Sequence, residues 1–282
     1  MAGSAGTCEF ASDPSPENAE DLYLRGKLSG HYEAYQGVGR WFVYLGADRF
    51  GPLNYQESGW QSSHELEIDS RGKGTLDVLE KYETASVPSR RRHPSGQGGG
   101  HLRGEVEQWL SEWFGHVRLR VEWFPNAVVS SVSILQGGVK SEEVRPTNTG
   151  FGISYALPIV VAGLWLNEGG TLIVDSPEAH LHPRVQSAIG RFVAHMAKSG
   201  VQVILETHSD HIVNGVRLAV AKGLEGLASS DVCMYFFDRG ATVVSVEKVQ
   251  VKPSGAVAKW PKGFFDQIEN DLRSIMEQGR GR

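Results

Sequence analysis

Two stretches of the chain change from an unbroken apolar run to polar residues within a few positions. Thr171–Val174 leads directly to Asp175, and Val201–Leu205 leads to the polar residues 206–211. Such a run is typical of a strand buried in a parallel sheet, with polar side chains just past its carboxyl end. Apolar residues at helical spacing between the two runs predict a helix that begins at Pro183. The pattern therefore predicts a β-α-β unit with polar chemistry at one edge.

In the rest of the chain, the spacing of apolar residues typical of strands and of helices recurs less clearly. It predicts strands over 41–45, 117–123 and 128–135 and helices over 102–114, 148–167 and 210–222. It also predicts a C-terminal hairpin and helix within 232–282. The hairpin is formed by strands 232–237 and 242–249, and the helix runs to Gln278. The fold class that follows is α/β. We expect an incomplete parallel sheet with flanking helices, plus a small β-rich and helical insertion.

Composition places the chain among ordinary globular proteins. Of its 282 residues, 40% are hydrophobic and 22% charged, and a net charge of −5 gives no general reason to expect nucleic-acid binding. Cys8 and Cys233 are too few for a disulfide framework or a cysteine-based zinc site. The longest apolar run, Ala156–Leu166, contains Pro158 and is too short to cross a bilayer. A cytoplasmic protein with no membrane partner is predicted.

Two segments are predicted to lie outside the packed core. Residues 1–20 are small, polar and acidic and predict a flexible leader. Residues 86–101 are rich in arginine and glycine and predict a mobile surface loop. The three arginines over 90–92 have the charge to touch a phosphate backbone, but a solvated basic loop is the favoured interpretation.

The residues at the predicted strand ends have the chemistry for handling a nucleoside triphosphate. Asp175 is suited to holding Mg²⁺, which prefers one or two carboxylates plus waters and phosphate oxygens. Glu178 is a second acid that can polarise water, and His208 can hydrogen-bond a γ-phosphate. Arg49 follows the first strand and is a further candidate. Each also has a structural explanation, as a turn, a cap or a satisfied polar residue.

A glycine-flanked segment opens the helix predicted over 148–167. Gly150, Gly152 and Ser154 stand where free backbone N–H groups and a positive dipole end suit an anion. The alternative is a helix cap that packs closely against a neighbour. We treat these three residues as candidate cofactor-binding positions.

Together these segments resemble the C-terminal half of ABC-type ATPases of the SMC, RecF and OLD (overcoming-lysogenization-defect) group. They are most similar to bacterial AAA-like ATPases of unknown function that end in Trp-Pro-x-Gly-Phe-Phe-Asp, here residues 260–266. The resemblance implies a P-loop NTPase-like, ABC-type domain over residues 21–282 that binds ATP and Mg²⁺. It implies that Asp175 is the magnesium-associated Walker B acid and His208 the switch histidine. Residues 148–154 would be the signature segment that contacts ATP held by an opposing subunit.

The chain departs from the family pattern directly after the Walker B acid. ABC proteins usually carry a catalytic glutamate there, whereas this chain has Ser176. A serine hydroxyl is not a general base at neutral pH unless a partner activates it. Either Glu178 replaces the glutamate, or hydrolysis is slow and ATP acts as a clamp.

The phosphate-binding glycine loop is the second departure. Neither Gly-Lys pair, at Gly26 or at Gly72, fits the Gly-x-x-x-x-Gly-Lys-[Ser/Thr] pattern, because Asp21 and Glu67 stand at the first glycine position. The chain therefore lacks a Walker A lobe, and on its own it is expected to bind ATP weakly.

The leading hypothesis is an ATP-binding and ATP-hydrolysing module that contributes Walker B, signature and switch-histidine elements. A homodimer or a hetero-partner would supply the P-loop, and a nuclease or DNA partner would couple ATP to DNA maintenance or phage defence, as the resemblance implies.

Two other functions stay open. The first is a metal-dependent hydrolase, since histidines and carboxylates at strand ends can bind Zn²⁺ or Mn²⁺. Its candidate ligands are Asp175, His180, His182, His208, Asp210 and His211. The second is a non-catalytic interaction protein that keeps the edge of an ATPase without a complete site.

Overall fold

The computed structural model describes residues 40–58, 67–136, 142–223, 226–239, 244–265 and 267–280. All of them belong to the second of two compact units, which runs from Gly37 to Arg282. The predicted leader over residues 1–20 lies outside the described residues.

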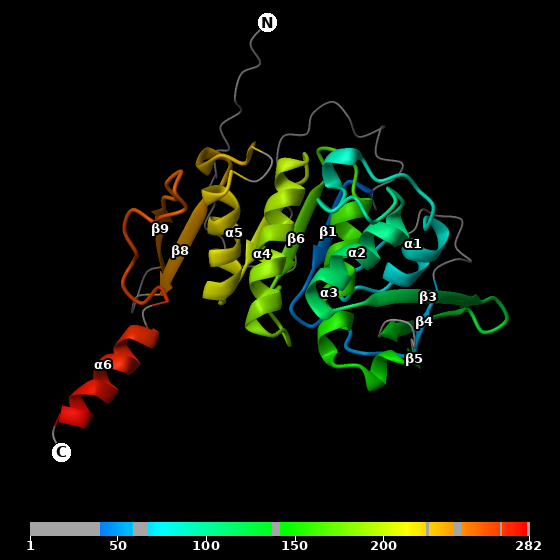
Figure 1. Ribbon diagram of the computed structural model, residues 1–282, viewed down its shortest axis with the longest axis horizontal. Helices are drawn as coiled ribbons and strands as arrows, with labels where there is room; N and C mark the ends of the chain where they lie inside the picture. The colour runs from blue at the N-terminus through cyan, green and yellow to red at the C-terminus, as the bar shows by residue number, and fades with distance from the viewer. Residues whose placement is uncertain are drawn as a thin grey trace, which may run out of the picture. The chain divides into compact units, whose positions relative to one another are not determined.

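A three-stranded parallel sheet is built from segments far apart in the sequence. It consists of β1 (Phe42–Leu45), β6 (Thr171–Asp175) and β7 (Gln202–Glu206), in the order β1-β6-β7 (Figure 1). In the register of the central pair, Asp175 lies opposite Glu206. The prediction that these two apolar runs are parallel strands ending at one edge is confirmed.

Helices cover one face of this sheet. They are α3 (Phe151–Trp165), α4 (Pro183–Lys198) and α5 (Asp210–Ala221), and Figure 1 shows them in front of the strands. Strand residues that point toward the helices are buried, and they include Val43, Leu45, Leu172 and Val174. Alternation along each strand sends the other residues to the opposite face.

That opposite face is largely uncovered by the described residues. Phe42, Tyr44 and Ile204 point to it, and each is 41% to 48% exposed. Parallel sheets are found almost only with both faces covered, so an apolar parallel face in contact with solvent is unusual.

The helix between the Asp175 and Glu206 strands begins where the sequence predicts. Pro183 is the first residue of α4, and the ring Nδ1 of His182 accepts a hydrogen bond of 3.2 Å from the Arg184 backbone N–H. After α4, Gly200 adopts a φ of +96°, a conformation that a glycine tolerates best.

A second, antiparallel sheet forms the predicted β-rich and helical insertion. Strands β3 (Val117–Phe124) and β4 (Val129–Gln136) lie where two strands are predicted, and they pair along their lengths. The short strands β2 (Tyr55–Glu57) and β5 (Glu142–Val144) also pair with β4. Helices α1 (Thr75–Lys81) and α2 (Leu102–Phe114) complete this part, and a single-turn 3₁₀ helix, Pro146–Asn148, leads to α3.

The prediction that residues 86–101 form a surface loop that cannot pack is wrong. Arg91 is only 1% exposed, and its guanidinium donates a hydrogen bond to the backbone carbonyl of Leu166. Glu105, fully buried at the start of α2, accepts a hydrogen bond of 3.0 Å from the Gly100 backbone N–H. Buried charges that bond backbone groups hold this segment against the core, a cause that composition does not reveal.

The C-terminal hairpin and helix are present as predicted. Strands β8 (Met234–Arg239) and β9 (Val244–Val249) pair in antiparallel register, and α6 (Gln267–Arg280) follows. A 3₁₀ turn, Ser229–Asp231, precedes the hairpin. No helix within the described part of the chain is both long and apolar enough to cross a membrane.

Candidate functional site

The carboxyl ends of β6 and β7 place two carboxylates against each other. Asp175 and Glu206 end neighbouring strands in register, which places their carboxylates side by side. Burial, and then this contact with Asp175, raise the pKa of Glu206 above its ordinary value. The Nε2 of His208 lies 3.2 Å from Oε1 of Glu206. The edge therefore joins two acids and one histidine.

Glu178 ties the turn after β6 to the loop after β7. Its Oε2 accepts a hydrogen bond of 2.7 Å from the Thr207 hydroxyl, and its Oε1 accepts one of 2.8 Å from the His208 backbone N–H. The structure thus brings Asp175, Glu178 and His208 together at one edge, while their chemical roles stay predictions. With both oxygens engaged, Glu178 is placed to hold the His208 loop.

Ser176 lies at the turn where the family pattern has a glutamate. Its φ of +47° is rare for a residue with a side chain. The Ser176 hydroxyl donates a hydrogen bond of 2.9 Å to Oδ1 of Asp175, and its backbone N–H donates one of 3.0 Å to the Glu206 carbonyl. Ser176 therefore orients the Asp175 carboxylate and locks the two strand ends together.

Arg49, the candidate that follows β1, lies beneath this edge. It is 2% exposed, and its guanidinium donates to the carbonyls of Gly46 at 2.6 Å, Asp175 at 2.7 Å and Ser176 at 2.8 Å. Burial lowers the pKa of Arg49, and the nearby negative groups oppose that shift. The cation also lies 5.6 Å from the ring centroid of Tyr155 on α3.

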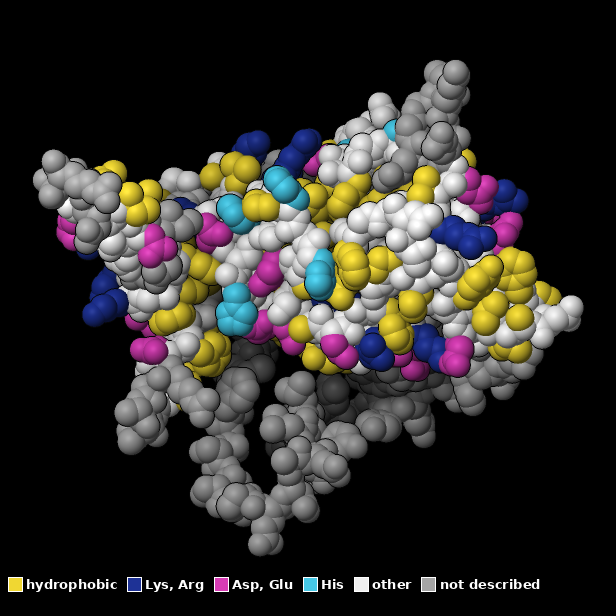
Figure 2. Space-filling model, turned by 90° about the horizontal axis from the view of Figure 1, so that it is seen from below, with side chains coloured by type: hydrophobic (Ala, Val, Ile, Leu, Met, Phe, Trp, Pro, Cys, Tyr) yellow, Lys and Arg dark blue, Asp and Glu magenta, His cyan; other side chains and the backbone are white. Residues whose placement is uncertain are grey.

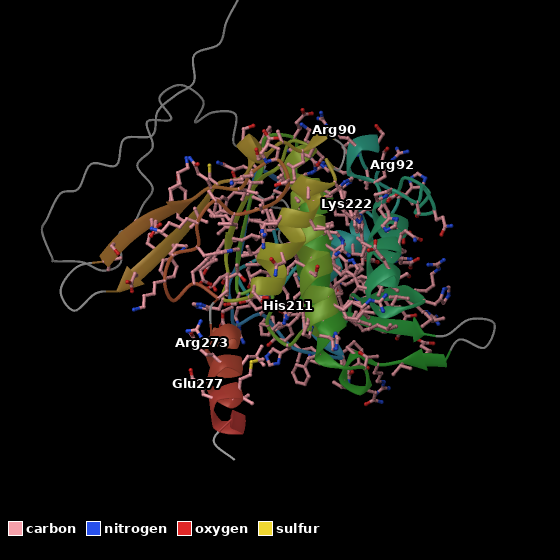
Figure 3. All side chains as sticks on the ribbon, turned by 60° about the vertical axis from the view of Figure 1, so that its left-hand side comes forward. Arg90, Arg92, His211, Lys222, Arg273 and Glu277 are labelled. Carbon is pink, nitrogen blue, oxygen red and sulfur yellow. The ribbon has the colours of Figure 1, made fainter. Side chains whose placement is uncertain are left out.

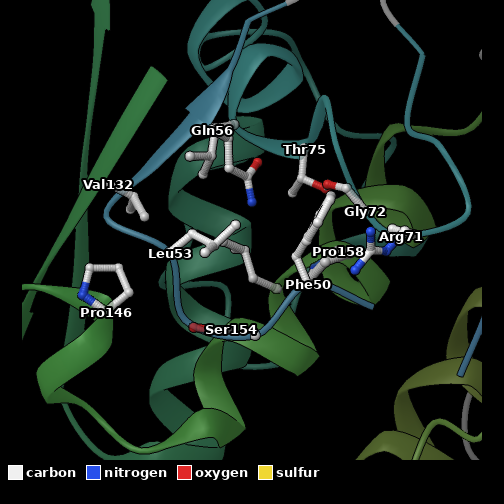
Figure 4. A pocket seen from close by; sticks show the side chains of 13 residues that line it. Phe50, Leu53, Gln56, Arg71, Gly72, Thr75, Val132, Pro146, Ser154 and Pro158 are labelled. Carbon is white, nitrogen blue, oxygen red and sulfur yellow. The ribbon is translucent and has the colours of Figure 1, made fainter. Parts of the chain in front are cut away.

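The three glycine-segment residues fall into different surroundings. Gly150 precedes α3, and a Cβ added there would meet open space. A Cβ on Gly152 would lie 2.9 Å from the Phe114 ring, so this glycine is needed for packing. Ser154 lines a small pocket of about 30 Å³ together with Arg71 and Pro158, among others (Figure 4). The helix opens as predicted, and nucleotide binding by these residues stays a prediction.

Comparison with known families decides what kind of domain carries this edge. Residues 62–214, more than half of the 282-residue chain, match the family described as "AAA domain, putative AbiEii toxin, Type IV TA system". The chain belongs to this AAA domain family. The predicted AAA-like ATPase resemblance is thereby confirmed.

Further comparisons add a second family and several distant structures. Residues 227–275 of this AAA-family chain match a "Protein of unknown function (DUF3696)". No curated protein matches the sequence.

Similar solved structures include several of SMC proteins. One, described as "Structural biochemistry of ATP-driven dimerization and DNA stimulated activation of SMC ATPases", is 9% identical with a TM-score of 0.42, and covers 71% of this chain and 97% of its own. The SMC head domain from Thermotoga maritima is 12% identical with a TM-score of 0.37, over 56% and 51% of the two chains. The SmcHead bound to the C-winged helix domain of ScpA is 11% identical with a TM-score of 0.40, over 62% and 54%. Scores this low support no inference about function.

Two histidines of the AAA domain that were candidate metal ligands have structural partners. His180, at a φ of +60°, stacks on Phe151 at a centroid distance of 5.2 Å and lies 4.5 Å from the Tyr155 ring. His182 caps α4. Among the described residues, no group of three or more histidine, cysteine or acidic side chains is arranged to hold a metal ion. The metal-hydrolase alternative therefore gains no support.

Histidine and acidic side chains nevertheless gather near the middle of the face drawn in Figure 2, which lies below the sheet in Figure 1. His180, His182 and His208 are all exposed. The AAA domain thus presents a polar, accessible surface at this edge.

The second Gly-Lys pair of the AAA domain forms a turn. Gly72 and Gly74 both have φ near +87°, and Gly74 directly precedes α1. The Nζ of Lys73 lies 2.7 Å from Oε2 of Glu57, so this lysine is already engaged in an ion pair. Both the structure of this turn and its sequence differ from a phosphate-binding loop.

Sequence analysis missed Glu206 as a functional candidate. Its signal was the spacing: Asp175 and Glu206 each stand four residues after the first residue of their strands, Thr171 and Gln202, which are paired. Only the register shows that their side chains meet.

Proposed function

We propose that this AAA domain is the Walker B, signature and switch-histidine part of an ATP-binding and ATP-hydrolysing module. A P-loop from outside this sequence completes it. The observation that carries the proposal is the joining of Asp175, Glu206 and His208 at the carboxyl ends of adjacent parallel strands. Open α/β sheets bind their ligands at this edge.

Asp175 and Glu206 are the residues we propose as Mg²⁺ ligands. Two carboxylates in contact repel each other when both are ionised, and a divalent cation between them removes that cost. Their donor set is oxygen only, which fits Mg²⁺. When bound, Mg²⁺ neutralises charge on phosphate oxygens.

His208 and Glu178 complete the proposed edge. The His208 side chain is 86% exposed, so its ring is free to reach a γ-phosphate, while Glu178 fixes the backbone from which it projects. ABC proteins usually carry a catalytic glutamate at the position of Ser176. We propose that Glu206, beside Asp175, replaces that carboxylate.

Two features of the parallel sheet support a P-loop lobe as the missing partner. The described part of the chain leaves Phe42, Tyr44 and Ile204 on this apolar face exposed. Within the described ranges, β7 pairs only with β6, which leaves its other edge available to a further strand. An added lobe would cover the face, extend the sheet and bring phosphate-binding N–H groups beside Glu206.

The finer assignments rest on the family. Gly150 and Ser154 are proposed to meet nucleotide across a dimer interface, in a homodimer or with a hetero-partner. The family description names a toxin–antitoxin system, which supports a role in phage defence or DNA maintenance in the cytoplasm, with a nuclease or DNA as the downstream partner.

The test begins with the chain alone. Isothermal titration with ATP and Mg²⁺ is expected to show no tight binding, and tight Mg²⁺-dependent binding would refute the need for a P-loop lobe. The second step co-expresses the chain with a separate P-loop polypeptide from the same genome. We expect ATP hydrolysis that Asp175→Asn lowers by about 100-fold. No nucleotide binding by the complex would reject the ATPase assignment.

Slow hydrolysis with ATP as a clamp is the second candidate, favoured by Ser176 at the position of the usual catalytic glutamate. Single-turnover measurements on the complex separate the two, since a clamp binds ATP and assembles without releasing phosphate. Glu206→Gln would abolish phosphate release in the first case and leave nucleotide-dependent assembly intact in the second.

A further inference from the structure

The C-terminal hairpin has one covered face and one exposed face. On the covered face, the ring of Phe236 packs against Phe264 at a centroid distance of 5.0 Å, and Met234 packs into a small buried cluster. The alternate residues point the other way, and the register places Phe237 opposite Val246. We call the apolar residues of this second set the hairpin face: Tyr235, Phe237, Val244 and Val246, each 52% to 65% exposed. Lys248, which pairs with Tyr235, lies on the same side.

Helix α6 also exposes an apolar surface. Leu272, Ile275 and Met276 lie three and four residues apart, which places them on one side of the helix. They are 49% to 66% exposed, and we call them the helix stripe. Arg273 and Glu277, one turn apart, point together to a different side (Figure 3).

Neither element is stable by its own hydrogen bonds. An isolated two-stranded hairpin is marginal in water, and so is a single helix of this length. Seven large apolar side chains within one short region are more than the scattered exposed residues of an ordinary surface. The hairpin face and the helix stripe should therefore each be stabilised by packing against a partner.

The chain leading into α6 is held on the covered face of the hairpin. Phe264, which packs on Phe236, stands three residues before Gln267, so α6 begins within about 10 Å of that contact. Arg217 fixes the same segment. Its Nε donates a hydrogen bond of 2.7 Å to the Gly255 carbonyl, and its guanidinium lies 5.1 Å from the Trp260 ring centroid. The start of α6 is thus tied to the side opposite the hairpin face.

We propose that the helix stripe of one copy packs on the hairpin face of a second copy, and reciprocally, in a two-fold dimer. The dimensions match, since 14 helical residues span about 21 Å and six strand residues about 20 Å. Burial of seven such side chains per copy removes on the order of 600 Å², against about 800 Å² in a standard interface.

This assigns an interaction role to the region matched as a protein of unknown function. The surface is separate from the sheet edge of Asp175 and needs no nucleotide. Failure of the proposed ATPase would leave it standing, and the reverse is also true.

The test measures oligomeric state by sedimentation of the full chain without nucleotide. Wild type is expected to be a dimer. Ile275→Glu and Val246→Glu should each weaken the dimer about 100-fold, because a charge is buried in an apolar contact. Ser274→Glu on α6 and Ser245→Glu on β9 add the same charge to the other side of each element and should leave it unchanged. Circular dichroism confirms that all four fold.

A mixing experiment distinguishes reciprocal docking from other dimers. Each glutamate variant alone disrupts both contacts of its dimer. A mixture of Ile275→Glu and Val246→Glu restores one intact contact, between a wild-type stripe and a wild-type hairpin face, so heterodimers should reappear. A monomeric wild type, a dimer insensitive to either glutamate, or a mixture that stays monomeric would each overturn the proposal.

Discussion

Acidic side chains gather in two regions of this protein, and their partners differ. At the start of α2, Glu105 accepts hydrogen bonds from backbone N–H groups, and Glu107 accepts one of 2.9 Å from Leu119. At the end of the parallel sheet, Glu206 faces another carboxylate, Asp175. A carboxylate bonded by N–H groups is already satisfied and serves the fold. Two carboxylates in contact gain stability only when a cation or proton joins them, which marks a binding site.

Removal of Arg49 should have the largest effect on stability, because this buried cation bonds the backbone beneath the acidic edge. Arg49→Met leaves the carbonyls of Gly46, Asp175 and Ser176 without their donor. We expect the free energy of unfolding to fall by about 3–5 kcal/mol. Urea denaturation measures this free energy. Arg49→Lys keeps the positive charge but loses the planar guanidinium, so its free energy of unfolding should lie between those of wild type and Arg49→Met. A loss below about 1 kcal/mol for Arg49→Met would show that the three bonds matter little.

Truncation of Glu105 should come next. Glu105→Ala leaves the backbone N–H groups of His93 and Gly100 buried without an acceptor and should cost roughly 2–4 kcal/mol. Glu83→Ala is the control, since Glu83 forms only a partly exposed ion pair with Arg103 and should cost less than about 1 kcal/mol. Equal losses would contradict the structural role given to Glu105.

At the sheet edge, two similar substitutions should differ in their effect on stability. Glu206→Gln removes repulsion from Asp175 and should leave the free energy of unfolding unchanged or raise it by less than about 1 kcal/mol. Glu178→Gln weakens the acceptor for Thr207 and His208 and should lower it by about 1 kcal/mol. Urea denaturation without divalent cations makes the comparison. A clear loss for Glu206→Gln would place Glu206 with the structural acids.

The smallest effect concerns pH and two acids on α2. Burial raises the pKa of Glu107, so the folded state favours its protonated form and the free energy of unfolding that it contributes falls as pH rises above 4.5. The hydrogen bond from His93 lowers the pKa of Glu112, so its contribution is present above 4.5 and is lost as pH falls below it.

Urea denaturation from about pH 3 to 7 on Glu107→Gln and Glu112→Gln measures both slopes. Relative to wild type, the first variant should gain stability as pH rises and the second should lose it. Slopes of the same sign would contradict the assigned causes.

The sequence predicts well those features that depend on near neighbours. The strand ending at Asp175, the start of α4 at Pro183 and the pairing of 117–124 with 129–136 all follow from local periodicity and turn residues. Elements of three residues, such as β2 and β5, are too short to show a period.

Features set by distant partners could not be predicted in this way. Arg91 is buried because it finds the carbonyl of Leu166, 75 residues away. Glu206 joins the candidate site because of its register with Asp175, and Gly152 is fixed by the Phe114 ring. In each case the decisive contact comes from tertiary structure, which no local pattern encodes.

The open face of Phe42, Tyr44 and Ile204 has a consequence for how the cell must make this protein. A chain that leaves the ribosome with an apolar sheet face and a free strand edge attracts chaperones and other copies of itself. Its yield should therefore rise when the proposed P-loop partner is expressed with it in matched amounts. The relative expression of the two genes should therefore affect how much of this chain folds.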